Sequence, residues 1–316
     1  MFVMNHMSKT NGYLRSSRER IIREEGARMS IHKFEVLLKV VELGSLTKAA
    51  EALGFTQSGV SHIIHSLETE FGFPLLLRDR SGVRLTVNGE QVVQPITEIM
   101  NWNEQLKQTI TSIHGLESGT IRIGTFTSVS VHWLPGMIKY FQQEYPNIHF
   151  KLVEGDYQEI EDWISNGQID CGFITIPSQA SFEVIPLKKD RMLAIVPLDH
   201  PLSHLDRFPL ERIATESFIM PREGSDYDVR RLLSRFAITP DIKFSVGDDY
   251  AIIAMVENSL GISILPELVL QGRDHNVKML ELEYPSYRSL GLAVHSLKKA
   301  SPATKRFLEY IRTSHS

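Results

Sequence analysis

The chain has 316 residues, which leaves room for two or three domains that each bury a core. Its formal net charge of −4 neither indicates nor excludes a small nucleic-acid-binding part, because a larger acidic part would mask it. Cys171 is the only cysteine, which excludes an intramolecular disulfide and a cysteine-based zinc cluster. The apolar runs fall short of the roughly 18 residues that span a bilayer. Residues 8–28 are too polar for a signal peptide, so we expect a soluble, cytoplasmic protein.

Residues 1–29 differ in composition from the rest of the chain. Six Lys or Arg residues and three acidic residues lie there, with little apolar periodicity. We interpret this stretch as an extension that is disordered or that reflects a start assigned too early, with Met29 as the true start. The codons of Glu24-Glu25-Gly26 would be purine-rich, as in a bacterial ribosome-binding site. The alternatives are a basic arm that contacts DNA and a short helix over 15–25.

Residues 45–68, SLTKAAEALGFTQSGVSHIIHSLE, predict two short helices joined by a tight turn. Ser45 is placed to cap the first helix, and Gly54 supplies the left-handed residue that ends it. Thr56 is placed to cap the second helix. The apolar residues of this second helix recur at helical spacing and predict its buried stripe: Val60, Ile63, Ile64 and Leu67.

The opposite face of the second helix carries short or hydrogen-bonding side chains. A helix that enters the major groove needs such a face, because donors and acceptors must reach the base edges. The alternative is a helix pair whose polar side chains only face solvent. The small Ala49-Ala50 pair suits close helix crossing and favours the DNA-binding interpretation. The side chains on this face are Gln57, Ser58, Ser61, His62 and His65.

The residues that follow continue this pattern with an Arg after the apolar triplet 75–77 and with a Gly-Val-x-Leu-Thr run over 82–86 before a long helix. Residues 30–88 thereby resemble the N-terminal domain of LysR-type transcriptional regulators. The resemblance implies a winged helix-turn-helix domain over 30–88, with two arginines on the wing close to the DNA phosphates. The chain departs from the family at His62, where Arg is usual, and at Asn88, where Ala is usual. The predicted DNA-binding residues are Thr47, Gln57, Ser58, Ser61, His62, His65, Arg80 and Arg84.

The charge of this domain is unusual for a DNA-binding module. Residues 30–90 contain six Lys or Arg and seven Asp or Glu. Phosphate neutralisation supplies much of the affinity of such modules, so they are usually basic. Here either the cations gather on one face, or several copies bind together and compensate through avidity.

Residues 89–117 predict one long linker helix. Its seam residues are spaced alternately by four and three, as in a coiled coil: Val92, Ile96, Ile99, Asn103, Leu106, Ile110 and Ile113. The polar Asn103 can fix register and partner number by pairing with a matching amide. We predict a homodimer joined by this seam, and the alternative is packing against the same chain. The family resemblance further implies a homotetramer made from dimers.

From Gly119 onward, strands alternate with helices, which predicts an α/β fold with parallel strands and right-handed crossovers. The landmarks Asp-Cys-Gly-Phe at 170–173 and Gly-Ile-Ser-Ile-Leu-Pro at 261–266 extend the resemblance to the second half of LysR-type regulators. That resemblance implies a two-lobed α/β ligand-binding domain similar to periplasmic binding proteins. We expect lobe I at 118–192 plus 290–316 and lobe II at 193–289.

Ligands of such sheets bind beyond the carboxyl ends of the strands, where helix N-termini converge. Free backbone N–H groups at the helix starts, together with Arg222, suit a carboxylate or other anion. Each candidate has an alternative role as a helix cap or in a surface ion pair. The predicted effector-binding residues are Thr127, Ser128, Val129, Thr175, Pro221, Arg222, Gly224, Ser225 and Asp248.

We therefore predict a bacterial, sequence-specific DNA-binding transcriptional regulator that is switched by a small-molecule effector bound between the two lobes. Its partners would be double-stranded DNA, the effector and further copies of the chain, with no membrane, cofactor, metal or catalytic residue. The sequence lacks the motifs of hydrolases, zinc proteases, phosphate loops and dinucleotide sites, which argues against an enzyme. The alternative is a solute-binding protein without a regulatory role, which would leave residues 1–90 unexplained.

Overall fold

The computed structural model describes residues 30–314 except 80–81, 115–116 and 179. The predictions for residues 1–29 and for Arg80 therefore lie outside the described residues. The chain divides between Asn103 and Glu104 into two compact units, which we call the N-terminal unit and the C-terminal unit and describe separately.

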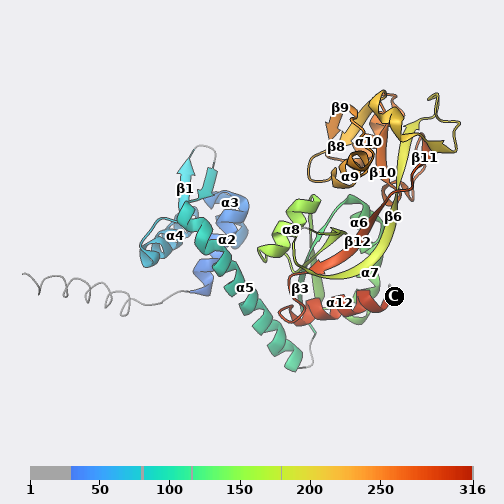
Figure 1. The fold of residues 1–316 in the computed structure, drawn as a ribbon. Coiled ribbons are helices and arrows are strands. Elements are labelled where there is room, and N and C mark those ends of the chain that lie inside the picture. The colour runs from blue at the N-terminus through green and yellow to red at the C-terminus, as the bar shows by residue number, and fades with distance from the viewer. Residues whose placement is uncertain (1–29, 80–81, 115–116, 179, 315–316) are drawn as a thin grey trace, which may run out of the picture. The chain divides into compact units, whose positions relative to one another are not determined.

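The N-terminal unit consists of three short helices, a β-hairpin and the first part of a long helix (Figure 1). Ser45 and Thr56 each accept a hydrogen bond from a backbone N–H in the first turn of the helix that follows, which confirms both predicted caps. Gly54 ends the first helix of this pair with a φ of 72°. The elements are α2 (Ile31–Leu43), α3 (Leu46–Leu53), α4 (Gln57–Phe71), β1 (Leu76–Asp79), β2 (Gly82–Leu85) and α5 (Val87–Ile113).

One apolar core holds these helices together. It is formed mainly by Val36, Leu37, Val40, Ala49, Ala50, Val60, Ile64 and Leu67. The hairpin of β1 and β2, which is the wing, is tied to this body because the Val83 N–H donates a 2.9 Å hydrogen bond to the Gly44 carbonyl oxygen. Gly82 has a φ of 129°, and a Cβ atom there would lie 2.9 Å from the same oxygen. The approach of the wing to the helices thus depends on glycine at position 82.

The apolar stripe of α5 has two environments. Val92 and Ile96 pack against the core of the N-terminal unit, and Ile96 is only 3% exposed. The later residues of the stripe are exposed by 40% to 77%: Ile99, Leu106, Ile110 and Ile113. Packing against the same chain therefore applies to the first part of the stripe, while the second part leaves an apolar surface in contact with solvent.

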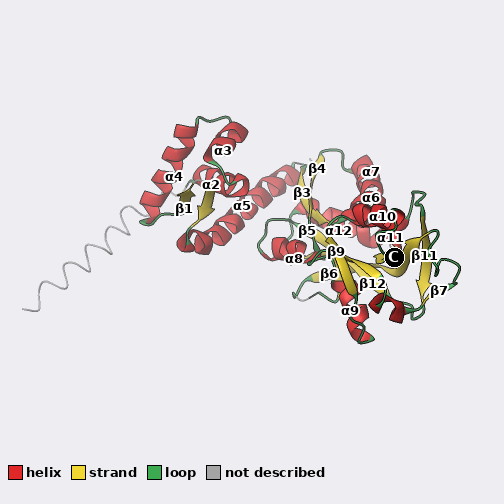
Figure 2. Cartoon of the chain, turned by 90° about the horizontal axis from the view of Figure 1, so that it is seen from above, coloured by secondary structure: helices red, strands yellow, loops and turns green. Residues whose placement is uncertain are grey.

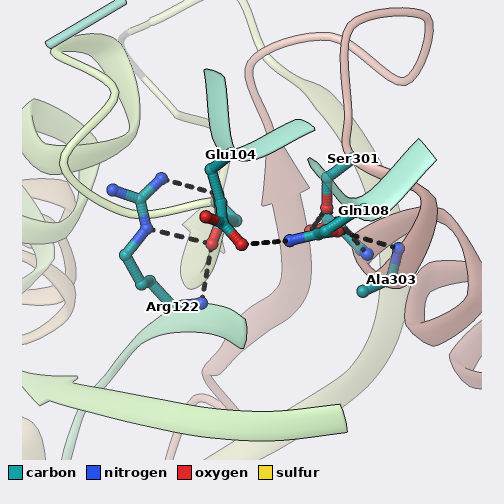
Figure 3. A network of polar contacts seen from close by, with 7 residues as sticks. Glu104, Gln108, Arg122, Ser301 and Ala303 are labelled. Carbon is teal, nitrogen blue, oxygen red and sulfur yellow. Dashed lines mark hydrogen bonds and ion pairs between the residues drawn. The ribbon is translucent and has the colours of Figure 1, made fainter. Parts of the chain in front are cut away.

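The C-terminal end of α5 belongs to the C-terminal unit. Gln108 is buried there, and its Nε2 donates to Glu104 while its Oε1 accepts from the Ala303 N–H, each at 3.4 Å (Figure 3). Gly119 lies against this amide, and a Cβ atom at that position would come within 2.7 Å of Gln108. This end of the helix is consequently held by specific polar contacts as well as by apolar packing.

The first lobe of the C-terminal unit contains three parallel strands, with β3 between β4 and β5. Its core is rich in Phe and Ile, including Phe141, Phe173 and Phe307. The elements are β3 (Gly119–Thr125), α6 (Thr127–His132), α7 (Leu134–Glu144), β4 (Ile148–Glu154), α8 (Tyr157–Ser165), β5 (Cys171–Ile176) and α12 (Pro302–Ser314).

The second lobe contains a parallel pair, β8 and β9, and strands that join the main sheet. In Figure 2 the strands of the C-terminal unit, drawn in yellow, are flanked by its helices, drawn in red. The elements of this lobe are β7 (Arg207–Phe208), η1 (Leu210–Ala214), β8 (Ser217–Pro221), α9 (Tyr227–Arg235), β9 (Asp241–Val246), α10 (Asp249–Glu257), β10 (Ser263–Pro266), α11 (Glu267–Leu270) and β11 (Val277–Leu282).

Two long strands connect the lobes, β6 (Glu183–Pro197) and β12 (Tyr287–Val294). The first part of β6 pairs with β12, and its second part pairs with β10 and β11, so one strand contributes to both lobes.

Candidate functional site

The first candidate site is the outer face of α4. Its buried side consists of Val60, Ile64 and Leu67, which fixes the rotation of the helix about its axis. The side chains predicted to read DNA lie on the opposite face, and four of them are exposed: Gln57, Ser58, His62 and His65. These groups can donate or accept hydrogen bonds without rearranging the core, as contact with base edges requires.

Ser61 and Arg78 form a contact that sequence reasoning did not include in the site. Ser61 is half-buried, and its Oγ accepts a 3.1 Å hydrogen bond from Nη1 of Arg78 at the end of β1. Arg78 is exposed and therefore places a guanidinium beside the polar face of α4. The signal was present in the sequence, since Arg78 follows the apolar triplet at 75–77, but its proximity to α4 depends on the fold.

The wing carries a further cation. Arg84 on β2 is exposed and forms an ion pair with Asp79 on β1. Thr47 is exposed in the first turn of α3. A guanidinium on the exposed side of the wing can contact a phosphate, although Asp79 competes for the same donors.

The second candidate site is a cavity of about 310 Å³ between the lobes of the C-terminal unit. Five of the predicted effector residues line it: Thr127, Pro221, Arg222, Ser225 and Asp248. Thr175 and Gly224 line a neighbouring cavity of about 330 Å³, and Tyr157 borders both. Val129 is fully buried in the core of lobe I. The structure thus gathers most of the predicted set around one cleft.

Ser128 has a structural partner rather than a free hydroxyl. It is 1% exposed, and its Oγ accepts a 2.7 Å hydrogen bond from Nη2 of Arg288 on β12. Arg288 is itself 2% exposed and forms a 2.7 Å ion pair with Asp190 on β6. Its Nη1 donates to the Tyr157 hydroxyl at 2.8 Å. These contacts join α6, α8, β6 and β12 where the connecting strands pass between the lobes.

The buried ion pair is well compensated. Burial opposes the charge of Arg288, but its contacts with Tyr157 and Asp190 outweigh that effect and raise its pKa. Burial raises the pKa of Tyr157 to about 12, and the neighbouring Arg288 only partly opposes the rise. Asp190 also accepts a 3.0 Å hydrogen bond from the Leu268 N–H at the start of α11. Most of the donors of Arg288 are therefore occupied before any ligand enters the cleft.

Carboxylates dominate the lining of the cavity, and Asp248 alone among them was predicted from the sequence as a site residue. Asp156 and Asp248 accept backbone N–H groups as the N-caps of α8 and α10. Glu159 completes a capping box with Asp156. The lining carboxylates are Glu154, Asp156, Glu159, Asp228, Asp248 and Asp249, whereas the lining cations are Arg222 and Arg288.

Two of these carboxyl groups have raised pKa values. Burial raises the pKa of Asp249 to about 6, Arg288 partly opposes this rise, and Asp248 and Glu154 add to it. Burial also raises the pKa of Asp228, against the effect of Arg288 and Arg231. Such shifts are frequent where a protein prepares a site for a ligand, since buried charges cost folding free energy.

The fold and the two sites define a class of protein. A ligand-responsive DNA-binding regulator consists of three parts, and this chain has all three: a winged helix-turn-helix with a polar recognition face, a long linking helix, and a two-lobed α/β domain with a cleft. Residues 31–90 match the family described as bacterial regulatory helix-turn-helix protein, lysR family, and residues 114–316 match the LysR substrate binding domain. The chain therefore belongs to the LysR family of transcriptional regulators, as the resemblance predicted.

Individual proteins support this assignment. The chain is 36% identical over 284 residues to YvbU of Bacillus subtilis, an HTH-type transcriptional regulator, covering 89% of this chain and 97% of that protein. Its fold is similar to that of full-length OxyR from Pseudomonas aeruginosa, with a TM-score of 0.70, 20% identity and coverage of 91% and 95%. The effector-binding domain of QuiR in complex with shikimate gives a TM-score of 0.57 at 25% identity, covering 63% of this chain and 97% of that one. None of the helices in the described part of the chain could span a membrane.

Proposed function

We propose that this regulator recognises a specific DNA site through the polar face of α4, with Arg78 and the wing contacting the backbone, and that an effector in the interlobe cleft changes its activity. The observation that carries the proposal is the exposed set of hydrogen-bonding side chains on α4, opposite the buried Val60, Ile64 and Leu67. Gln57 is the side chain best suited to a bidentate contact with adenine.

Selection from a pool of random duplexes tests this proposal with the full-length protein. We expect enrichment of two inverted half-sites about one DNA turn apart, because a symmetric dimer presents two copies of α4. Retention of every duplex with equal affinity, or of none at low salt, would contradict the proposal. A charge-neutral winged domain makes the low-salt condition informative, since non-specific binding depends on phosphate neutralisation.

The exposed part of the α5 stripe supports dimerisation. Ile99 and Leu106 lie seven residues apart and are 40% and 59% exposed. Replacing both by Asp would place charges in a coiled-coil seam, so the double variant should be monomeric and bind DNA weakly. Gln94→Asp with Ser112→Asp is the matched control, because these exposed positions lie off the stripe. A parent chain that stays monomeric at micromolar concentration in sedimentation experiments would count against the seam.

The cleft can switch the protein only if a ligand binds one arrangement of the lobes better than another. Thr127 lines the cavity at the start of α6, and a tryptophan there should occupy the space that a ligand needs. In a reporter strain that carries a selected DNA site, Thr127→Trp should abolish the response to changes in growth medium and keep basal DNA affinity. Gln143→Trp, on the exposed side of α7, should respond like the parent. An unchanged response in both variants would place the switch elsewhere.

A further inference from the structure

The charges that line the interlobe cavity are unequal. Six carboxylates and two guanidiniums face it, and one guanidinium, Arg288, is already neutralised by Asp190. The other, Arg222, is 61% exposed and lies 4.0 Å from Asp156. The anion expected from the sequence would thus meet two guanidiniums that already lie beside carboxylates, and a majority of like charges, which is unfavourable in a partly enclosed cavity.

Three of the six carboxylates remain available to a ligand, namely Glu154, Asp249 and Asp228. Asp156, Glu159 and Asp248 use their oxygens on backbone N–H groups in helix caps. Glu154 accepts a single hydrogen bond, from Thr127 at 3.2 Å, and Asp249 makes none within the described residues. Asp249 lies in the first turn of α10 and lines the same cavity as Glu154 and Asp248.

Asp228 provides an independent observation. Its side chain is 4% exposed, lines the cavity and belongs to the first turn of α9. Its Oδ1 accepts from Arg231 at 3.1 Å, but its Oδ2 is buried without a hydrogen-bond partner among the described residues. A buried carboxylate oxygen without a donor costs free energy, and a ligand that brings a donor or a positive charge would recover part of that cost.

We propose that the effector is a small organic cation, an amine or guanidine, whose charged nitrogen binds in the interlobe cavity against Asp249, Glu154 and Asp228. An ammonium group offers three donors and a guanidinium five, which matches carboxylate oxygens that lack donors. Phe126 and Tyr157 also line the cavity and can cover the apolar part of such a ligand. This inference rests on the proposed function, because it assigns the chemical class of ligand to the same cleft.

Two ligands of equal chain length provide the test. We would measure binding of 1,5-diaminopentane and of glutarate, with agmatine as a second cation, to the full-length protein by isothermal titration calorimetry at neutral pH. The cations should bind and glutarate should not. Asp249→Asn with Glu154→Gln should weaken cation binding by roughly tenfold to a hundredfold, the usual worth of a charged hydrogen bond. The control Asp206→Asn with Glu211→Gln makes the same change in charge on the exposed surface of lobe II and should bind like the parent.

Asp228→Asn removes the charge of the third carboxylate and should also weaken cation binding. Three outcomes would overturn the inference. The protein could bind glutarate in preference to the cations, it could bind neither cation at millimolar concentration, or the cleft and control variants could have equal effects. The proposed function has a separate readout in DNA selection. A protein that selects a DNA site and binds glutarate keeps the function and loses this inference, whereas one that selects no DNA loses the function itself.

Discussion

In the N-terminal unit the candidate base-reading side chains on α4 are polar and mostly exposed, whereas in the C-terminal unit the side chains that line the cavity are mostly charged, and several of them have buried partners. Gln57 and Ser58 can be replaced without removing the support of another side chain in the core. Arg288, by contrast, joins four elements and lines the cavity at the same time. The difference follows from access to water. Side chains on the exposed face of α4 are hydrogen-bonded to water until DNA binds, whereas buried groups in the cleft need hydrogen-bond or ion-pair partners within the protein before any ligand binds.

The largest effect should come from Arg288→Met. The change leaves Asp190 buried without its partner, and breaking such a pair costs about 3–5 kcal/mol. Unfolding in urea, followed by tryptophan fluorescence, should show this loss in the C-terminal unit. Adding Asp190→Asn should restore part of the stability, because the unpaired charge is then removed. Arg84→Met on the exposed wing is the comparison, and its cost should stay below about 1 kcal/mol. Equal costs at the two sites would break the contrast between them.

Gln57→Ala should have an intermediate effect, confined to DNA binding. Losing a contact to one base edge should cost about 1–3 kcal/mol at one base pair and relax the preference there. Fluorescence anisotropy with single-base variants of a selected site would measure it. The stability of the protein should not change, since Gln57 is exposed. A uniform loss across all sequences would instead indicate a backbone contact.

The affinity of the cleft for 1,5-diaminopentane should depend on pH. Partial burial raises the pKa of Asp249 to about 6, Arg288 opposes this rise, and Asp248 and Glu154 add to it. Below that pH the carboxyl group loses its charge. Tyr157 also faces this group and stays protonated throughout, since its pKa is about 12. The affinity should therefore rise by about tenfold from about pH 5 to about pH 7. In Asp249→Asn the rise should be much smaller, and an equal rise in both proteins would assign it to another group.

Arg84→Ala should have the smallest effect. Because Arg84 contacts a phosphate at most, its loss should weaken binding to all sequences alike and reduce the slope of log affinity against log salt by about one. Titrations at several salt concentrations would detect it. The ion pair with Asp79 reduces the expected loss, so Asp79→Asn should strengthen DNA binding slightly. A change in sequence preference would show that the wing reads bases.

The features that could be predicted from the sequence are those set by near neighbours. Ser45, Gly54 and Thr56 cap or end helices through contacts within three or four residues, and the apolar stripe of α4 follows from helical spacing. The carboxylate-rich cleft was not predicted, because Glu154, Asp228 and Asp249 lie on separate elements and meet only through the crossing of β6 and β12. Arg288 gave no local signal, since nothing in its surroundings in the sequence indicates that an arginine would be buried.

The helix α5 has a practical consequence for building hybrid sensors. Its early turns belong to the winged helix-turn-helix core through Ile96, and its late turns belong to the C-terminal unit through Gln105, which donates to the Ala300 carbonyl, and through Gln108. A chimera joined at either end of the helix would therefore place foreign residues against a core that they do not fit. Met100 also packs against the N-terminal core, so a joint within 101–103 would leave both sets of contacts native. The heptad register must be kept across the joint so that the exposed stripe stays continuous. That short interval is where a recognition module and an effector module from different regulators can be exchanged.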